Sequence, residues 1–362
     1  MGGSTIPDWV TFPEADWTDI TPAQAGLDVD AYHEFIGGLS PTGASFGGED
    51  HSANKWGVAV TRGGHMLKTW GDPSYRFQTA SVGKAFARAL FGLAVQDGMV
   101  EGDDLIGNTW TGEDELSHPH KYLTEGYHKT LTWNHLLGPR DQALHYGGFP
   151  IELGSDWRAH GRGASALGWE FPSWANWTGD PSYDLYAQVE PGTVGLYSSG
   201  GFWRLGQALT ALWRQDLKEV LDERLFGKIG IPPEGWDWFS GKDVKSQKDF
   251  YPSIPGSYTY LDPPYEIQGH IVRSAPGWVI VSAADLARFG HLVATGGVWK
   301  GERILDPEWL RGHGGGNKSG LSGEGAHYTA IGMVTTVGIT HPFTVAKESF
   351  LPERLFLGPV SF

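Results

Sequence analysis

The sequence predicts a mixed α/β fold in which the two ends of the chain build one sheet and a helical, loop-rich lobe is inserted between them. Three patterns carry this prediction. Residues 55–70 have the pattern of two strands joined by an Arg-Gly-Gly turn, and residues 328–339 form a β-branched, apolar run typical of a central strand. Residues 101–250, between them, are loop-rich with short helical patterns. Strands at both ends of a helical middle favour this arrangement.

Four further segments have helical patterns. Residues 28–39 place apolar side chains at helical spacing behind an aspartate cap and end in glycines. A long apolar helix is predicted over residues 82–97, directly after an extended piece. The clearest helical pattern of the middle runs over residues 201–226, and a capped helix over residues 282–295 ends at two glycines.

The length of 362 residues allows two or three folding units and a cleft between lobes. We expect an α/β sheet domain formed by residues 1–100 and 271–362. Residues 101–270 then form the inserted helical, loop-rich domain.

The composition excludes several classes of function. There are 27 Lys and Arg against 42 Asp and Glu, so a net charge of -15 argues against binding to nucleic acid or to anionic membranes. The absence of cysteine excludes disulfides, thiolate zinc sites, iron–sulfur clusters and a cysteine nucleophile. Neither a signal peptide nor an apolar run of membrane-spanning length is visible, which predicts a cytoplasmic protein without a membrane span.

The most informative segment is Ser-Val-Gly-Lys at residues 81–84, where an extended piece turns into a helix. Ser81 and Lys84 are three residues apart, so their side chains share one face of the first turn. A serine hydroxyl is a poor nucleophile until a neighbouring base takes its proton, and burial can lower the pKa of a lysine enough for that role. The helix N-terminus favours the negative charge that develops in acyl transfer. Apolar neighbours of Lys84 predict a desolvated site.

The chain holds a second Ser-x-x-Lys pair, Ser52 and Lys55, in a polar loop that leads into a strand. No helix positions Lys55 beside Ser52, so the sequence context favours Ser81 as the candidate nucleophile. The alternative interpretation of Ser81 and Lys84 is a helix cap beside a solvated lysine.

Residues 77–86 resemble the first motif of the serine β-lactamase and penicillin-binding superfamily, in particular its branch of class C β-lactamases, family VIII esterases, amidases and D-peptidases. Tyr197-Ser-Ser199, just before a helix, resembles the Tyr-x-Asn or Tyr-x-Ser second motif. Residues 277–305 are also similar to this branch, so the resemblance covers most of the chain. It implies the β-lactamase-like fold, an antiparallel sheet flanked by helices with an inserted helical lobe.

The resemblance also implies roles for single residues. Ser81 would be the nucleophile that forms an acyl-enzyme, Lys84 its activating base, and Tyr197 the group that carries the proton to the leaving group. Ser199 stands where the family usually has Asn and would hydrogen-bond Lys84 or the substrate. His145 lies in a segment that would border the cleft, where it either contacts substrate or packs.

The third motif departs from the family. The family has Lys-Thr-Gly or a variant such as His-x-Gly on an edge strand, and this chain offers His313 followed by three glycines. Small residues at Gly315 and Gly316 would let the backbone approach the substrate, and the N–H groups of Gly316 and Ser81 would form the oxyanion hole. Histidine in place of a permanent cation favours an esterase over a β-lactamase or carboxypeptidase. The alternative is a flexible glycine loop.

Other signals are weaker. The Gly-x-Ser-x-Gly pattern around Ser45 does not join a strand to a helix, as a nucleophile elbow must. His118, His120, His128 and His135 lack the spacing of a helical metal site and suit solvated loops better. The interpretation as a carbohydrate-active protein is supported only by the 17 Trp residues.

The sequence therefore predicts a serine hydrolase that cleaves a carboxylic ester, with amides next, through a seryl acyl-enzyme and without a metal or organic cofactor. The alternatives are an amidase, D-peptidase or β-lactamase of the same superfamily, or a non-catalytic binding module that retains the fold. The acyl group, the leaving group and the oligomeric state are left open.

Overall fold

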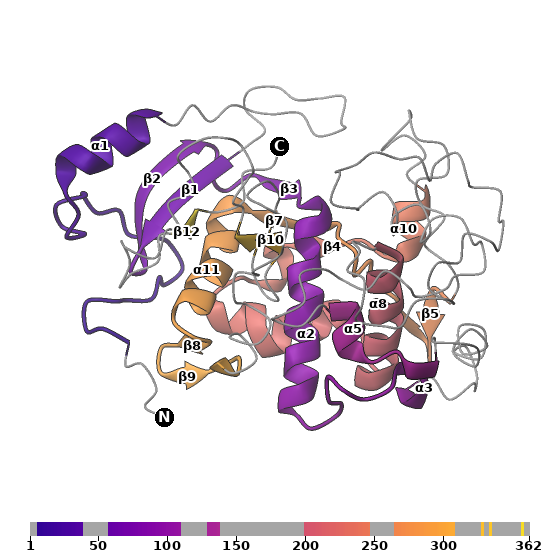
Figure 1. Cartoon of the computed structure of the whole chain (residues 1–362). Coiled ribbons are helices and arrows are strands. Elements are labelled where there is room, and N and C mark those ends of the chain that lie inside the picture. The colour runs from indigo at the N-terminus through magenta and orange to yellow at the C-terminus, as the bar shows by residue number, and fades with distance from the viewer. Residues whose placement is uncertain are drawn as a thin grey trace.

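The computed structural model describes a mixture of helices and short strands, as the sequence predicts (Figure 1). The description covers residues 6–38, 57–109, 129–137, 199–246, 264–307, 327–328, 333–334 and 356–357. Helix α2 (Lys84–Gln96) runs through the centre, with α8 (Ser199–Trp213) on one side and α11 (Ala283–Ala294) on the other (Figure 1). Within these residues, no helix combines the length and apolar character that a bilayer span requires.

The first sheet joins the two ends of the chain. Strands β1 (Gly57–Arg62) and β2 (His65–Gly71) form the predicted hairpin, and β12 (Phe356–Leu357) pairs antiparallel with the other edge of β1. The hairpin turns at Gly63 and Gly64, whose φ values of 56° and 88° suit glycine. The prediction that both termini contribute strands to one sheet is confirmed for this pairing.

A second sheet has the order β3-β7-β4, from β3 (Arg76–Gln78), β7 (Val279–Ser282) and β4 (Asp237–Trp238). The prediction of one sheet is therefore wrong for the described strands. Among the described residues, no strand pairing joins β1, β2 or β12 to β3, β7 or β4. Two further antiparallel pairs are short: β5 (Glu266–Ile267) with β6 (His270–Ile271), and β8 (Val298–Trp299) with β9 (Glu302–Arg303).

The predicted strand over residues 328–339 is also wrong. Residues of β10 (His327–Tyr328) pair antiparallel with β11 (Met333–Val334), with Tyr328 opposite Met333. Because Tyr328 and Met333 face each other across an antiparallel pair, they cannot belong to one strand.

Three predicted helices are confirmed, and two of them start at side chains that cap them. The carboxylate of Asp28 accepts the N–H of Ala31 at 2.9 Å at the start of α1 (Val29–Gly38). The hydroxyl of Ser282 accepts the N–H of Asp285 at 3.0 Å at the start of α11. The third is α2.

The helix predicted over residues 201–226 is divided. After α8 the chain turns, Asp216 caps α9 (Leu217–Leu221) by accepting the N–H of Lys218 at 2.9 Å, and a π-helical turn, η7 (Asp222–Phe226), follows. The new cap starts a second helix where the apolar pattern runs on unbroken. Short helices complete this part of the chain: α3 (Ile106–Thr109), α5 (Trp133–Leu137), η8 (Gly227–Ile229), η9 (Pro233–Gly235) and α10 (Gly241–Ser246).

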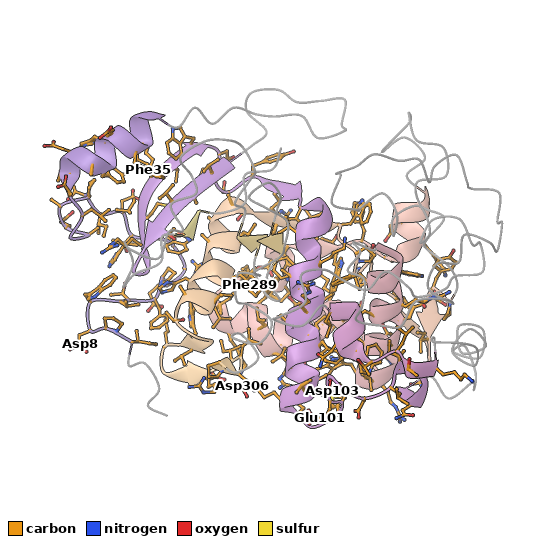
Figure 2. The ribbon with its side chains drawn as sticks, in the orientation of Figure 1. Asp8, Phe35, Glu101, Asp103, Phe289 and Asp306 are labelled. Carbon is orange, nitrogen blue, oxygen red and sulfur yellow. The ribbon has the colours of Figure 1, made fainter. Side chains whose placement is uncertain are left out.

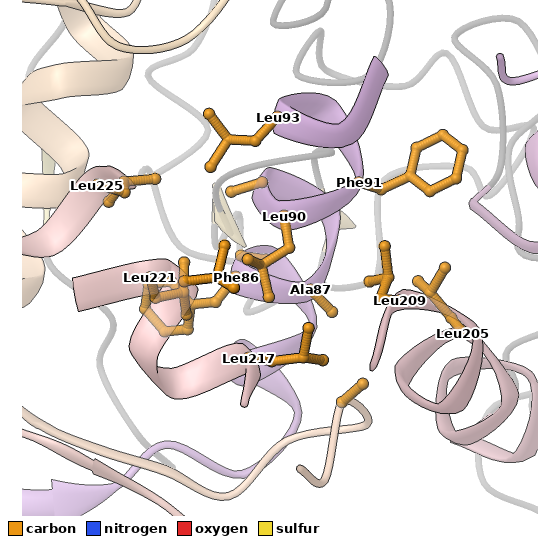
Figure 3. Close-up of a cluster of buried hydrophobic side chains, with 14 of the residues drawn as sticks. Phe86, Ala87, Leu90, Phe91, Leu93, Leu205, Leu209, Leu217, Leu221 and Leu225 are labelled. Carbon is orange, nitrogen blue, oxygen red and sulfur yellow. The ribbon is translucent and has the colours of Figure 1, made fainter. Parts of the chain in front are cut away.

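One apolar core surrounds α2. Every residue from Lys84 to Ala94 is buried, because this helix is apolar on nearly all its faces. Figure 3 shows Phe86 and Leu90 among leucines of α9 and η7. The ring centroid of Phe91 lies 5.6 Å from that of Trp133, in α5. A fully buried leucine contributes about 1.5–3 kcal/mol, so this packing fixes the position of α2. The core combines helices of both predicted domains, and the division at residues 100 and 270 stays a prediction.

Helix α11 covers the other side of α2. Phe289 of α11 lies beside α2 (Figure 2), and its ring centroid is 5.0 Å from that of Phe86. Arg288, the preceding residue, is buried and donates hydrogen bonds to three carbonyls: Pro13 at 3.3 Å, Ala15 at 2.7 Å and Ile229 at 3.2 Å. A single guanidinium thus fastens the N-terminal segment to α11.

We predict that Arg288→Met loosens this N-terminal segment selectively. Three carbonyls lose their donor, and the two in buried bonds, those of Pro13 and Ile229, cost about 1–3 kcal/mol each if left unsatisfied. Hydrogen exchange should accelerate at least about tenfold at the amides of Thr11 and Ile20, which donate to Gly63 and Met66. Arg303→Met, at an exposed arginine, serves as the control and should leave these amides unchanged. Unchanged exchange in Arg288→Met would contradict the anchoring role.

Candidate active site

Ser81 lies in the short turn that connects the second sheet to α2. This turn, η1 (Ala80–Gly83), is a 3-10 helix that follows β3 and leads directly into α2. Its start is fixed to β7, because the backbone N–H and the hydroxyl of Thr79 both donate to the carbonyl of Val279 at 2.8 Å. The prediction that an extended piece turns into a helix at Ser81 is confirmed.

Gly83 allows a second segment to lie directly against this turn. A Cβ atom at Gly83 would lie 2.8 Å from the Cα of Gly277, closer than Cβ atoms approach backbone in proteins. The glycine pair therefore brings the backbone of residues 276–279 against the Ser-x-x-Lys turn. Any side chain at position 83 would push these two segments apart.

Trp238 and Trp278 shape that second segment. The indole N–H of Trp238, on β4, donates to the carbonyls of Ser274 at 2.9 Å and of Gly277 at 3.0 Å. Trp278 has a φ of 59°, a left-handed conformation that costs a bulky residue about 1–3 kcal/mol. The contacts made by Trp238 hold this conformation in place, so the carbonyl of Pro276 has a defined position.

Lys84 meets that carbonyl inside the protein. Its side chain is 1% exposed, and its Nζ donates a hydrogen bond to the carbonyl oxygen of Pro276 at 2.6 Å. The Nζ also lies 5.6 Å from the ring centroid of Phe202, on α8. The expectation of a desolvated lysine is therefore confirmed.

Burial lowers the pKa of Lys84 well below its ordinary value of 10.5, because the charged ammonium loses its hydration. The positive charge of Arg88 lowers this pKa further. Both effects favour the neutral amine, which has a lone pair and can accept a proton. A neutral amine is the state in which a lysine can act as a base.

Of the remaining candidate residues, the structure describes two and does not describe the others. Ser199 is the first residue of α8, the helix that packs against α2, and His135 lies in α5. Tyr197, His145, His313, Gly315 and Gly316 lie outside the described residues, as do Ser45, Ser52, His118, His120 and His128. Their roles stay predictions. Across the described side chains, no group of three or more His, Cys, Asp or Glu could hold a metal ion.

Sequence reasoning missed three contributors to this site: Pro276, Phe202 and Arg88. A backbone carbonyl leaves no signal in a sequence, and a phenylalanine in an apolar helix looks like any core residue. Arg88 did carry a signal, since a charged residue four positions after Lys84 interrupts an otherwise apolar helix.

No protein-family model and no curated protein matches the chain. Three solved structures among those that resemble it are a penicillin-binding protein homologue from Caulobacter crescentus, the octameric penicillin-binding protein homologue from Pyrococcus abyssi and the D-amino acid amidase from Ochrobactrum anthropi. Their identities are 14%, 15% and 18%, and their TM-scores 0.46, 0.44 and 0.39. The matches cover 78%, 72% and 70% of this chain.

The chain spans 76% of the Caulobacter protein and 68% of the Ochrobactrum protein, but only about half, 56%, of the Pyrococcus protein.

We predict that Lys84→Met changes how the free energy of unfolding depends on pH. The unfolded chain binds a proton at Lys84 that the folded chain lacks, so the lysine makes the wild type more stable as the pH rises. This holds between the lowered pKa of the folded protein and 10.5. As the pH rises through this range, urea unfolding should show the wild type gaining stability relative to the variant, by at most about 1.4 kcal/mol per pH unit for one proton.

Lys242→Met removes an exposed lysine, which pairs with Glu266, and serves as the control. Its difference from the wild type should stay constant over the same pH range. A constant difference for Lys84→Met as well would mean that Lys84 keeps its proton in the folded protein.

Proposed function

We propose that the protein is a serine hydrolase of the β-lactamase and penicillin-binding superfamily, and that it cleaves a carboxylic ester, with amides next, through a seryl acyl-enzyme. The observation that carries this proposal is the buried amine of Lys84, fixed on the carbonyl of Pro276 at 2.6 Å, one turn after Ser81. The motifs at Ser81 and Tyr197 agree with it.

In the proposed acylation, the neutral amine of Lys84 takes the proton of the Ser81 hydroxyl as the serine oxygen attacks the substrate carbonyl carbon. The carbonyl oxygen then carries a negative charge. The N–H groups of Ser81 and Gly316 would bind it, as an oxyanion hole does. When the tetrahedral intermediate collapses, the alcohol leaves with a proton that Tyr197 passes to it from Lys84.

Deacylation reverses these roles with water as the nucleophile. Water attacks the seryl ester while Tyr197 and Lys84 accept its proton, the carboxylic acid leaves, and Ser81 regains its hydrogen. No redox partner is required. Burial of Lys84 matters in both halves, because an amine that water kept protonated could not begin either of them.

The preference for an ester follows from the third motif. His313, in place of the lysine that is usual in the family, supplies no permanent positive charge for a substrate carboxylate. The proposed substrate is therefore a small molecule whose acyl group carries no carboxylate at this position. His145 and Ser199 are the further side chains that we propose for substrate contact.

We expect that a fluorophosphonate probe or a p-nitrophenyl ester adds one acyl or phosphonyl group to the peptide that contains Ser81. Ser81→Ala should abolish this mass adduct, and Lys84→Met should slow its formation about 10²- to 10⁴-fold, the usual contribution of a general base. Tyr197→Phe should retain part of the acylation but lose turnover, so that the adduct accumulates.

Ser52→Ala is the matched control, because Ser52 and Lys55 repeat the Ser-x-x-Lys spacing elsewhere in the chain. This variant should acylate like the wild type. Hydrolysis that survives Ser81→Ala would reject the nucleophile. A wild type that forms no adduct would favour a binding module that retains the fold.

A further inference from the structure

Arg88 is a second buried cation on α2, one helical turn after Lys84. Its side chain is 3% exposed, and its Nη2 donates to the carbonyl of Leu137, at the end of α5, at 2.7 Å. The guanidinium carbon lies 5.2 Å from the centroid of the Phe202 ring, and the Nζ of Lys84 lies 5.6 Å from the same centroid. Two basic side chains thus pack against one aromatic ring inside the core.

Two positive charges at this spacing repel each other, and the low dielectric of the core strengthens the repulsion. The two side chains differ in how they can respond. A guanidinium keeps its proton in proteins, whereas a buried lysine gives its proton up readily. The protonation state that relieves the repulsion is therefore a neutral Lys84 beside a charged Arg88.

Described cations on three neighbouring helices have partners of their own. Arg204 of α8 donates to Gln207 at 2.8 Å and is two residues after Phe202, so it lies about 200° around the helix from the ring. Lys218 of α9 binds Asp222, and Arg288 of α11 binds the N-terminal segment. The positive charge of Arg88 lowers the pKa of Lys84, in addition to the larger effect of burial.

We propose that Arg88 is a positioning residue, whose fixed charge keeps the amine of Lys84 unprotonated and whose hydrogen bond holds the end of α5 against α2. Its catalytic importance depends on the proposed hydrolase. Its action on Lys84 does not, and it can be measured without turnover.

The kinetic test compares Arg88→Gln, which removes the charge and keeps an N–H donor for Leu137, with Arg88→Lys, which keeps a charge. In Arg88→Gln the acid limb of the pH profile of Ser81 acylation should move upward by about one pH unit, with about a tenfold loss of rate below it. Arg88→Lys should keep the limb close to its wild-type position. Arg204→Gln, at a buried arginine of α8, is the matched control and should leave the limb in place.

The second test titrates Lys84 directly by following its ¹³Cε signal in protein labelled at lysine, assigned by its loss in Lys84→Met. The midpoint should rise in Arg88→Gln and stay near that of the wild type in Arg88→Lys. If Arg88→Gln does not fold, Arg88→Met supplies the same comparison, and circular dichroism monitors folding in each variant.

An unmoved midpoint in the neutral variants would overturn the proposal, and so would an equal rise in Arg88→Lys, which would indicate packing rather than charge. If the midpoint moves as expected while the wild type forms no adduct at Ser81, the action of Arg88 stands and the proposed hydrolase is rejected.

Discussion

The burial of the Lys84 amine is the constraint on which the rest of the candidate site depends. Lys84 lies at the start of α2, where its Nζ has exchanged water for the carbonyl of Pro276 and the ring of Phe202. Burying a charged ammonium costs several kcal/mol. The lowered pKa of Lys84 reduces this cost, because the amine can lose its proton at this place. The same loss is what the proposed role of Lys84 as a base requires.

Distant parts of the chain supply the surroundings of this amine. Gly83 allows close approach to Gly277, and Trp238, on a strand far away in the sequence, fixes the carbonyls around Pro276. The apolar core of α2 with α8, α9 and α11 holds these segments rigidly together. Because interiors are close-packed, a small displacement at any of these contacts would reach the amine.

Lysine and arginine respond differently to burial in this core. Both cations of α2 are buried against Phe202, but a buried lysine gives up its proton readily whereas an arginine stays charged. The guanidinium of Arg288 shows the other use of a buried arginine, since its donors satisfy three carbonyls and fasten a segment. The same residue type thus acts by charge at one position and by hydrogen bonding at the other.

The sequence by itself determined the local features: the hairpin at β1 and β2, the caps at Asp28 and Ser282, the start of α2 after Ser81, and the apolar character of the helix around Lys84. Each depends on neighbours within a few residues, where periodicity and capping rules apply. Tertiary structure alone decided the division of the described strands into separate sheets, the pairing of Tyr328 with Met333, and the distant partners that bury Lys84. Strand pairing and backbone carbonyls join residues that are distant in the chain, and the spacing of side chains along a sequence carries no record of such contacts.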